Sequence, residues 1–441
     1  MENPSITKRD RAGGGPSLRE CSLEAETRSN GLRRAAWFVA YSAMPVYAIF
    51  AGGSAATFLA IATVLLLADA LRSGQLDTAL TQAFRQISGS APLILALLFA
   101  ALGWLSLLWS PWPADTVRFA TNITGVLALA VAWLRLARAG DMADIERMIL
   151  LGIVVASGLL LLALYGIVDI RAQLVARHQD SPFNRSILIV STFAAVLVAL
   201  AFAAGRRRAL GWAALILAAI VAFNSGSETS QLFLLAFPPL LALFFLTERF
   251  AGWLSALVAP LIYFVFPLLV PLMRPLLDMA AELGYRQLLV SSSAMARQEI
   301  WTSFLNTAMQ RPILGWGLGT ERHVPLASQA MDANGLGPWT HAHSLPVQVL
   351  ANLGLTGFIL AGGAITALCL TIGGLPKASR APAFALVTAM LVVWSISHGA
   401  WQSWWLAVVA LALVPLFVQG RTGPRIPGRG RADLPCNEAC R

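Results

Sequence analysis

Charged residues are scarce in this chain of 441 residues: only 12% of positions are Asp, Glu, Lys or Arg, whereas 57% are hydrophobic. A soluble domain of ordinary size cannot bury so much apolar surface, so the composition excludes a soluble globular protein. Apolar runs of about 20 residues, the length of a membrane-spanning helix, recur along the chain. Because these runs do not alternate with polar residues, they exclude a membrane β-barrel and predict an all-α polytopic membrane protein.

Cysteine and lysine are also rare, with four cysteines and two lysines. Cys21, Cys436 and Cys440 lie in polar tails and Cys369 lies in an apolar run, so we expect no disulfide on the outer face. The spacing of Cys436 and Cys440 would permit a metal site, but a reduced, flexible tail is the preferred interpretation. No cleavable signal peptide is visible, because the first 34 residues are polar and the first apolar run continues into a second.

The apolar runs predict about twelve membrane-spanning helices. They lie at residues 35–51, 53–71, 91–109, 116–137, 148–168, 185–204, 209–224, 229–248, 250–273, 354–373, 381–398 and 400–418. With this topology, 23 of the 32 basic residues fall on the side of the two chain ends. Lys and Arg collect in cytoplasmic loops, so both ends are predicted to be cytoplasmic. The net charge of +10 is then explained by topology and contact with anionic lipid, and nucleic-acid binding is not expected.

Five segments follow from these spans. They are a cytoplasmic tail at 1–34, nine spans at 35–273, an outer loop at 274–353, three spans at 354–418 and a second cytoplasmic tail at 419–441. An outer loop of about 80 residues is usually functional or disordered. Its composition favours a folded lid or vestibule, with helical patterns at 276–289 and 295–309 and a glycine-rich turn at Gly315–Gly319.

Every basic residue assigned to the outer side is an arginine. The nine are Arg118, Arg171, Arg177, Arg185, Arg274, Arg286, Arg297, Arg311 and Arg322. Arg185 opens a predicted span, and Arg297 lies in a helical pattern four residues before Trp301. An arginine at membrane depth is costly unless paired and then usually marks a site, and a guanidinium group binds phosphate oxygens in bidentate fashion. The alternative is snorkelling to the headgroup level, which stays open above all for the first three arginines.

Histidine occurs only five times, and His341 and His343 lie one residue apart at the start of an apolar run. A metal site is not expected, because no cluster of further ligands accompanies them. Two interpretations remain. One is a helix cap in which Thr340 or Ser344 satisfies the first amides, and the other is a neutral imidazole, near its usual pKa of about 6.5, that acts as a base toward a hydroxyl group.

The stretch RPILGWGLGT lies between Arg297 and the two histidines. Its glycine spacing is reminiscent of a phosphate cradle, but it follows no strand and lacks the lysine of a P-loop. A tight loop that lets backbone approach backbone is therefore the favoured interpretation.

Taken in order along residues 295–360, these motifs form a recognisable set. They are Arg297 and Trp301, then Pro312, Gly315, Gly317 and Gly319, then His341, His343 and Ser344, then Gly354, Leu355 and Gly357. The ordered set, in one long outer loop of a twelve-span protein, resembles the O-antigen ligase and polymerase superfamily. The resemblance implies a GT-C-like glycosyltransferase in the bacterial inner membrane, with its site in a loop that faces the periplasm.

For the ligase branch, the resemblance implies transfer of O-antigen polysaccharide from undecaprenyl diphosphate to a sugar hydroxyl of lipid A-core. The transfer would invert the anomeric centre and need neither a metal nor another cofactor. The implied roles are a catalytic base, diphosphate binding and support of these groups. They fall on His343 with His341, on Arg185, Arg297 and Arg118, and on Trp301, Asn184, Gly315 and Gly317, respectively.

Three positions depart from the superfamily pattern. Ser344 stands where asparagine is usual, Ser227-Glu228-Thr229 stands where Ser-Arg-Gly is frequent, and Asn352 replaces the usual glutamate before Gly-Leu-x-Gly. No arginine can therefore be carried over to position 228. The role of an acid at position 352 is in doubt.

Other functions stay open at this point. O-antigen polymerases and protein O-oligosaccharyltransferases share the donor and the motifs and differ in the acceptor. A transporter of lipid-linked glycans is less favoured, because no inverted repeat is evident and the predicted spans carry few polar residues.

Overall fold

The computed structural model describes residues 31–168, 183–205, 207–250, 252–285, 287, 294–324 and 341–420. In these ranges the chain is helical and forms no strand. Ten of the described helices are long and apolar enough to cross a membrane, and a shorter apolar helix covers Ser403–Gln419. The predicted class, an all-α polytopic membrane protein, is confirmed.

The described residues form helical elements along the chain. In chain order they are η1 (Val39–Ala43), α2 (Met44–Tyr47), α3 (Ala55–Arg72), α4 (Leu76–Gly89), α5 (Ala91–Leu105), η2 (Ser106–Leu108), α6 (Pro113–Leu136), η3 (Ala139–Asp141), α7 (Met142–Leu164), α9 (Asn184–Ala203), α10 (Arg208–Ser225), α11 (Glu228–Phe250), α12 (Gly252–Ala280), η4 (Ala281–Tyr285), α14 (Ala294–Gln310), η5 (Thr320–Arg322), α16 (Leu345–Gly373), α17 (Lys377–Ile396) and α18 (Ser403–Gly420).

The predicted spans each overlap a helix of the structure, and residues 31–47, which are helical throughout, account for the first. Helix α4 falls in none of the predicted spans. Most of the two predicted tails, together with Arg171, Arg177, Arg286, Thr340 and three of the four cysteines, lies outside the described residues.

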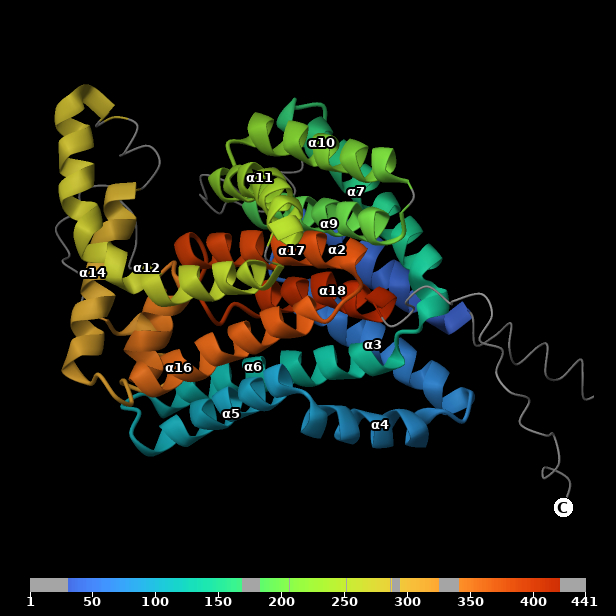
Figure 1. The fold of residues 1–441 in the computed structure, drawn as a ribbon, viewed down its shortest axis with the longest axis horizontal. Coiled ribbons are helices and arrows are strands. Elements are labelled where there is room, and N and C mark those ends of the chain that lie inside the picture. Colours follow the sequence, from blue (N-terminus) through green and yellow to red (C-terminus); the bar gives the residue numbers. More distant parts are fainter. Residues whose placement is uncertain are drawn as a thin grey trace, which may run out of the picture.

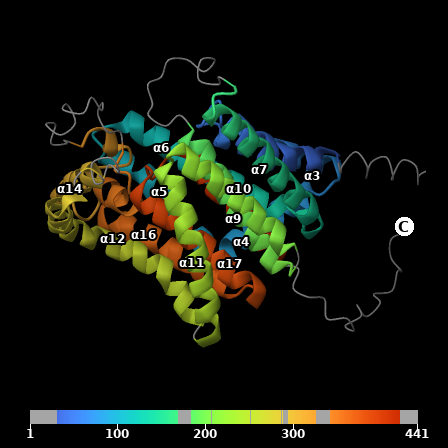
Figure 2. The same ribbon diagram turned by 90° about the horizontal axis from the view of Figure 1, so that it is seen from above.

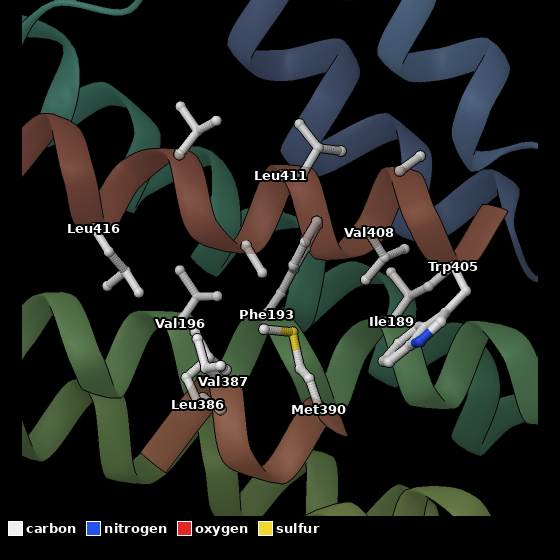
Figure 3. Packing of buried hydrophobic residues seen from close by; sticks show 14 of the residues in the cluster. Ile189, Phe193, Val196, Leu386, Val387, Met390, Trp405, Val408, Leu411 and Leu416 are labelled. Atoms are coloured by element: carbon white, nitrogen blue, oxygen red, sulfur yellow. The ribbon is translucent and has the colours of Figure 1, made fainter. Parts of the chain in front are cut away.

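Helix α9 is the centre of the bundle, with 89% of its membrane-length window buried, and α17 follows with 78%. Side chains of α9, α17 and α18 meet in one apolar layer, among them Phe193, Met390 and Leu411 (Figure 3). The hydroxyl groups of Ser191 and Thr192 donate to carbonyl oxygens one turn back in α9, at 2.8 Å each, so they are satisfied within the helix. A helix enclosed in this way fixes the position of the residues at its ends.

The helices that flank the predicted outer loop extend into it. Helix α12 continues to Ala280 and is followed by η4 up to Tyr285, beyond the predicted boundary at residue 273. Helix α16 begins at Leu345, before the predicted boundary at residue 354. Helix α14 packs against α12 and α16 at one end of the molecule, away from α3 (Figures 1 and 2).

Ion pairs join the helices at the opposite ends from α14. The guanidinium group of Arg33, whose side chain is 5% exposed, donates to Asp69 at 2.8 Å and to Asp141 at 2.9 Å. Further pairs are Arg34 with Asp144, Arg207 with Glu146, and Arg380 with Glu248. All these arginines belong to the set that the sequence predicts on the cytoplasmic side.

Two neighbouring aspartates test the energetic difference between buried and exposed pairs. We expect Asp141→Asn to lower the free energy of unfolding by about 3 kcal/mol, because it leaves the buried guanidinium of Arg33 with half of its compensating charge. Asp144→Asn, which touches a pair whose arginine is 66% exposed, should cost less than about 1 kcal/mol. Unfolding of the purified protein in detergent measures both values. An equal decrease in the free energy of unfolding for the two variants would contradict a stronger contribution from the buried ion pair.

Candidate functional site

His343 lies just before α16 in a backbone conformation that histidine rarely adopts. Its φ is 52°, in the left-handed region, which costs a residue with a Cβ atom about 1–2 kcal/mol and concentrates at functional sites. Ser344 follows at the N-cap position of α16, but its side chain forms no capping hydrogen bond and its hydroxyl oxygen is buried without a partner in the described part of the chain. The helix-cap interpretation is therefore wrong for Ser344.

The ring of His343 is fixed by the loop between α17 and α18. Its Nδ1 lies 2.9 Å from the carbonyl oxygen of Ser397, and since a carbonyl oxygen only accepts, Nδ1 carries the hydrogen. A second bond joins the same two segments, because the backbone N–H of Ala400 donates to the side-chain oxygen of Gln348 at 3.0 Å. In the neutral ring, Nε2 is then the basic nitrogen of His343.

Burial holds the pKa of His343 well below its usual value of 6.5. The neighbouring ring of His341 and the positive charge of Arg297 act in the same direction, whereas the Ser397 carbonyl opposes them. His343 is therefore neutral at pH 7 and able to accept a proton.

His341 packs edge-on against His343, with 4.0 Å between the ring centroids and 61° between the ring planes. Burial and the charge of Arg185 lower the pKa of His341 to about 4. Its Nδ1 is buried and has no hydrogen-bond partner among the described residues. Gly399 lies so close that a Cβ atom there would come within 2.9 Å of His341, so the α17–α18 loop has no room for a side chain at this point.

A third histidine, which the sequence reasoning missed, joins the pair. His398 lies in the α17–α18 loop beside Trp404 and Trp405, with ring centroids 5.1 and 5.5 Å apart, and its Nε2 is buried without a partner in the described part of the chain. Burial, followed by His341 and the two arginines of the site, lowers the pKa of His398 to about 3. Its place at the outer end of a predicted span was the one indication in the sequence.

Arg185 is the second residue of α9 and its side chain stays exposed at the end of this buried helix. The guanidinium lies 5.6 Å from the centroid of the Trp404 ring, and the side-chain stem packs over Gly52, where a Cβ atom would come within 3.1 Å of it. No carboxylate of the described residues forms an ion pair with Arg185. A guanidinium held in place without a counter-charge is suited to bind an anion.

Arg297 projects from α14, with 19% of its side chain exposed, and lies 3.4 Å from a carboxylate oxygen of Glu228 at the start of α11. Burial lowers the pKa of Arg297, and Glu228 partly offsets this effect. Trp301, one turn later, is buried against Phe266 with the rings nearly perpendicular, so it anchors α14 in the core.

The structure thus brings together most of the predicted site. His341, His343, Arg185 and Arg297 all act electrostatically on His398 or on one another, and Asn184 precedes Arg185. Two positive charges and three uncharged imidazoles share one end of the bundle. In the part of the chain that the structure describes, no group of three or more His, Cys, Asp or Glu side chains could hold a metal ion.

The glycine-rich turn packs against α16 at a break in that helix and forms hydrogen bonds with the carbonyl groups there. Gly354 has φ 60° and ψ −160°, which interrupts the helix. The backbone N–H groups of Trp316 and Gly317 donate to the carbonyl oxygens of Ala351 and Asn352 at 3.1 and 2.8 Å. A Cβ atom at Gly315 would come within 2.4 Å of Asn352, so the predicted close approach of two backbones is confirmed.

A carboxyl group also occupies the place that the sequence left in doubt. Glu321 in η5 is 2% exposed and accepts a hydrogen bond from the side-chain nitrogen of Asn352 at 2.7 Å. Burial raises the pKa of Glu321 to about 7, against the opposing effect of that hydrogen bond. A carboxyl group from another segment of the chain therefore lies beside position 352.

Arg118 has its contacts in a different cluster. Its guanidinium lies 5.9 Å from the centroid of the Phe119 ring, and that of Arg322 lies 5.7 Å from the same centroid. Asp115 accepts a hydrogen bond from His323 at 3.0 Å, and Trp112 stacks on the His323 ring. Among the contacts of the described residues, none joins Arg118 to His341, His343 or His398, so the structure does not bring Arg118 into the histidine site.

An apolar cavity of about 290 Å³ opens between α5, α6, α16, α17 and α18. Its walls include Leu345, two residues after His343, and Trp401, three residues after His398. The cavity therefore reaches residues that follow the histidines closely in sequence, and it runs along Ile123 and Ala130 of α6.

The fold and the site define a class: a multi-pass, all-helical membrane protein whose polar chemistry, made of arginine and histidine, gathers at one end of the bundle. Comparison with known proteins narrows this class. Residues 213–362 match the family model described as O-antigen ligase (Wzy_C). This range includes Glu228, Arg297 and the pair His341 and His343.

Two curated proteins are similar to the chain over about 170 residues. One is named "Putative polysaccharide ligase RC0486" in Rickettsia conorii and is 28% identical over 169 residues, which cover 35% of this chain and 38% of that protein. The other is named "Putative polysaccharide ligase RP358" in Rickettsia prowazekii and is 28% identical over 165 residues, 34% of this chain and 39% of that protein. The similarity thus spans about two fifths of these relatives. The findings support an O-antigen ligase-family protein.

The break in α16 provides a test of its support. Gly354→Ala should destabilise the fold by at least about 2 kcal/mol, because φ 60° with ψ −160° is open only to glycine and a Cβ atom would come within 2.4 Å of Ile313. Gly125→Ala in α6, where no atom lies within 4 Å, is the matched control and should be neutral or slightly stabilising. Thermal unfolding in detergent compares the two, and an equally mild effect of both would count against the strained break.

Glu321 makes stability depend on pH. Its pKa is raised from 4.5 to about 7 on folding, so its contribution is fully present below pH 4.5 and is lost as the pH rises through 7. The free energy of unfolding of Glu321→Gln minus that of the wild type should therefore increase between pH 4.5 and pH 8, by up to about 3 kcal/mol, because only the wild type must ionise a buried carboxyl group at pH 8. Unfolding measured across this pH range checks the prediction, and a difference that does not change with pH would contradict it.

Proposed function

We propose that the protein is an O-antigen ligase that transfers a glycan from undecaprenyl diphosphate to a sugar hydroxyl of lipid A-core. The observation that carries the proposal is a cluster of a neutral histidine, His343, and two guanidinium groups, in which the charge of Arg297 acts on His343 and that of Arg185 acts on the neighbouring His341. Arg185 forms no ion pair with a described carboxylate. Glycosyl transfer from a diphosphate needs these two functions, a base for the incoming hydroxyl and positive charge for the leaving group.

The proposed step is a single displacement. The acceptor hydroxyl oxygen attacks the anomeric carbon, its proton passes to Nε2 of His343, and the bond from the anomeric carbon to the diphosphate oxygen breaks. Arg185 and Arg297 bind the diphosphate and stabilise the charge that develops on it. The attack from the opposite side inverts the anomeric centre.

The low pKa of His343 in the free protein is compatible with its role as a base, because a bound donor would raise that pKa. The histidines are neutral because burial and the two arginines disfavour a further positive charge. A bound diphosphate adds negative charge beside them and raises their pKa toward the operating pH. His343 thus becomes a stronger base when the donor is present.

The apolar cavity supports a lipid-linked substrate. It lies between helices and is lined by Leu345 and Trp401 of the two segments that carry the histidines, so an apolar chain held in it would have its polar head near the site. We further propose that this end of the bundle faces the periplasm of a bacterial inner membrane, with both chain ends cytoplasmic. The ion pairs of Arg33, Arg207 and Arg380 at the other end support this orientation.

The test of the proposed function is transfer in a purified system. Wild-type protein, given undecaprenyl diphosphate-linked O-antigen and rough lipopolysaccharide in the presence of EDTA, should produce a glycan ladder on a gel. His343→Ala should lower the rate at least about a hundredfold, the contribution of a general base, without loss of fold by thermal unfolding. Chain extension of the donor in place of transfer to the acceptor would instead indicate a polymerase.

The pH dependence of the same reaction tests the charge state of the base. Because the pKa of His343 lies well below 6.5, the acidic limb of kcat/KM, which reports the free enzyme, should also lie well below pH 6.5. Protonation of His343 should therefore not lower kcat/KM at pH 6 or above. It should lower kcat/KM only when the pH falls through the lowered pKa of His343. An acidic limb at pH 6.5 or above would contradict a neutral, buried base.

A further inference from the structure

A second cationic site lies at the outer end of α6. Arg118 and Arg322 point their guanidinium groups at the ring of Phe119, and the Arg322 side chain is 38% exposed. Asp115, the carboxylate of the cluster, lies 3.9 Å from Arg322, the outer limit of an ion pair, and its other oxygen accepts the hydrogen bond from His323. Arg322 therefore has a carboxylate partner only at the limit of an ion pair, and this carboxylate also binds His323, an arrangement that leaves the guanidinium able to bind an anion.

The cluster is held in place rather than formed by loose surface side chains. Trp112 and His323 stack with 4.2 Å between the centroids and 3° between the planes. The hydroxyl of Thr116 donates to the carbonyl oxygen of Leu318, and Asp115 packs against Gly319, where a Cβ atom would come within 2.7 Å of it. The segment that carries Arg322 is thus fixed to the first turn of α6, which brings Arg322 and Arg118 to the same aromatic ring, that of Phe119.

The same face of α6 leads from this cluster into the apolar cavity. Phe119 lies one turn before Ile123, and Ile123, Val126 and Ala130 line the cavity wall. The cavity is bounded on its other side by Leu345 and Trp401, the neighbours of the histidine site. The cavity wall thus connects the α6 face that carries Phe119 with Leu345 and Trp401 of the segments that carry the histidines.

We propose that Arg118 and Arg322 bind a phosphate group on the saccharide of the acceptor glycolipid. This inference rests on the proposed function: the donor diphosphate occupies Arg185 and Arg297, so a second cationic site serves the second substrate. It assigns to the acceptor an arginine, Arg118, that is predicted from the sequence to bind the donor diphosphate. The site positions the acceptor hydroxyl and takes no part in bond formation.

The experiment uses full-length protein in nanodiscs of phosphatidylcholine, which carries no net charge and so does not compete. Wild type, Arg118→Gln/Arg322→Gln, and the control Arg274→Gln are compared with saturating donor. Arg274 is paired with Asp278 on the far part of α12, outside both sites. The acceptor is lipid A-core with its phosphates intact or removed by phosphatase, and equilibrium binding of both acceptors is measured by native mass spectrometry alongside turnover.

The double variant should raise KM for the phosphorylated acceptor about tenfold or more, the effect of losing charge-assisted hydrogen bonds to phosphate. kcat and the KM for the donor should stay at the wild-type values, as should all constants of Arg274→Gln. With the dephosphorylated acceptor, wild type and double variant should have the same KM, because the phosphate and the arginines act as one pair.

An unchanged KM, or an equal rise for both acceptors, would overturn the inference while leaving the ligase function intact. If the wild type does not transfer the glycan but still binds the phosphorylated acceptor, and this binding requires both arginines, the proposed function is overturned and the phosphate site stands. If the wild type neither transfers to nor binds the phosphorylated acceptor, both proposals fail.

Discussion

The hydrogen bond from Nδ1 of His343 to the carbonyl oxygen of Ser397 joins the two stretches on which the site depends. It sets the tautomer of His343 and locks the start of α16 to the loop between α17 and α18, where His398 and the tryptophans lie. The bond between Ala400 and Gln348 repeats the connection one turn further on. The left-handed backbone of His343 is stabilised because α16 packs against α17, and α17 and α18 pack against the central helix α9.

Burial explains why this site consists of arginines and uncharged histidines. In a low-dielectric environment an imidazole loses its proton readily when a guanidinium is near, whereas a guanidinium keeps its charge. The site is therefore a set of fixed positive charges beside neutral bases, which is the electrostatic requirement of displacement at a carbon attached to diphosphate. Glu228 stands at a position where the superfamily pattern frequently has arginine, and it pairs with Arg297. This pair reduces the net positive charge of the site, so Arg185 is the cation of the site that forms no ion pair with a described carboxylate.

Much of this architecture could be predicted from the sequence. Apolar runs located the helices. Residue type combined with position at the end of a predicted span pointed to Arg185 and to the pair His341 and His343, and a helical pattern in the loop pointed to Arg297; the structure brings these four residues near one another. His398 was missed because a single histidine among tryptophans forms no local pattern. The pairing of Glu321 with Asn352, 31 residues apart, and of Asp115 with His323, 208 residues apart, depends on how the chain folds back. Helix ends were also misplaced, since hydropathy does not reveal that the glycine turn completes a broken α16.

The central claim is that Arg185 and Arg297 hold a diphosphate within reach of His343. A cryo-electron microscopy structure of the His343→Ala variant in nanodiscs with undecaprenyl diphosphate-linked glycan tests it most directly. The account predicts both phosphates within hydrogen-bond distance of Arg185 and Arg297, with the anomeric carbon facing position 343 and the lipid chain entering the apolar cavity. Phosphates bound at Arg118 and Arg322, or at any point away from the histidines, would contradict it.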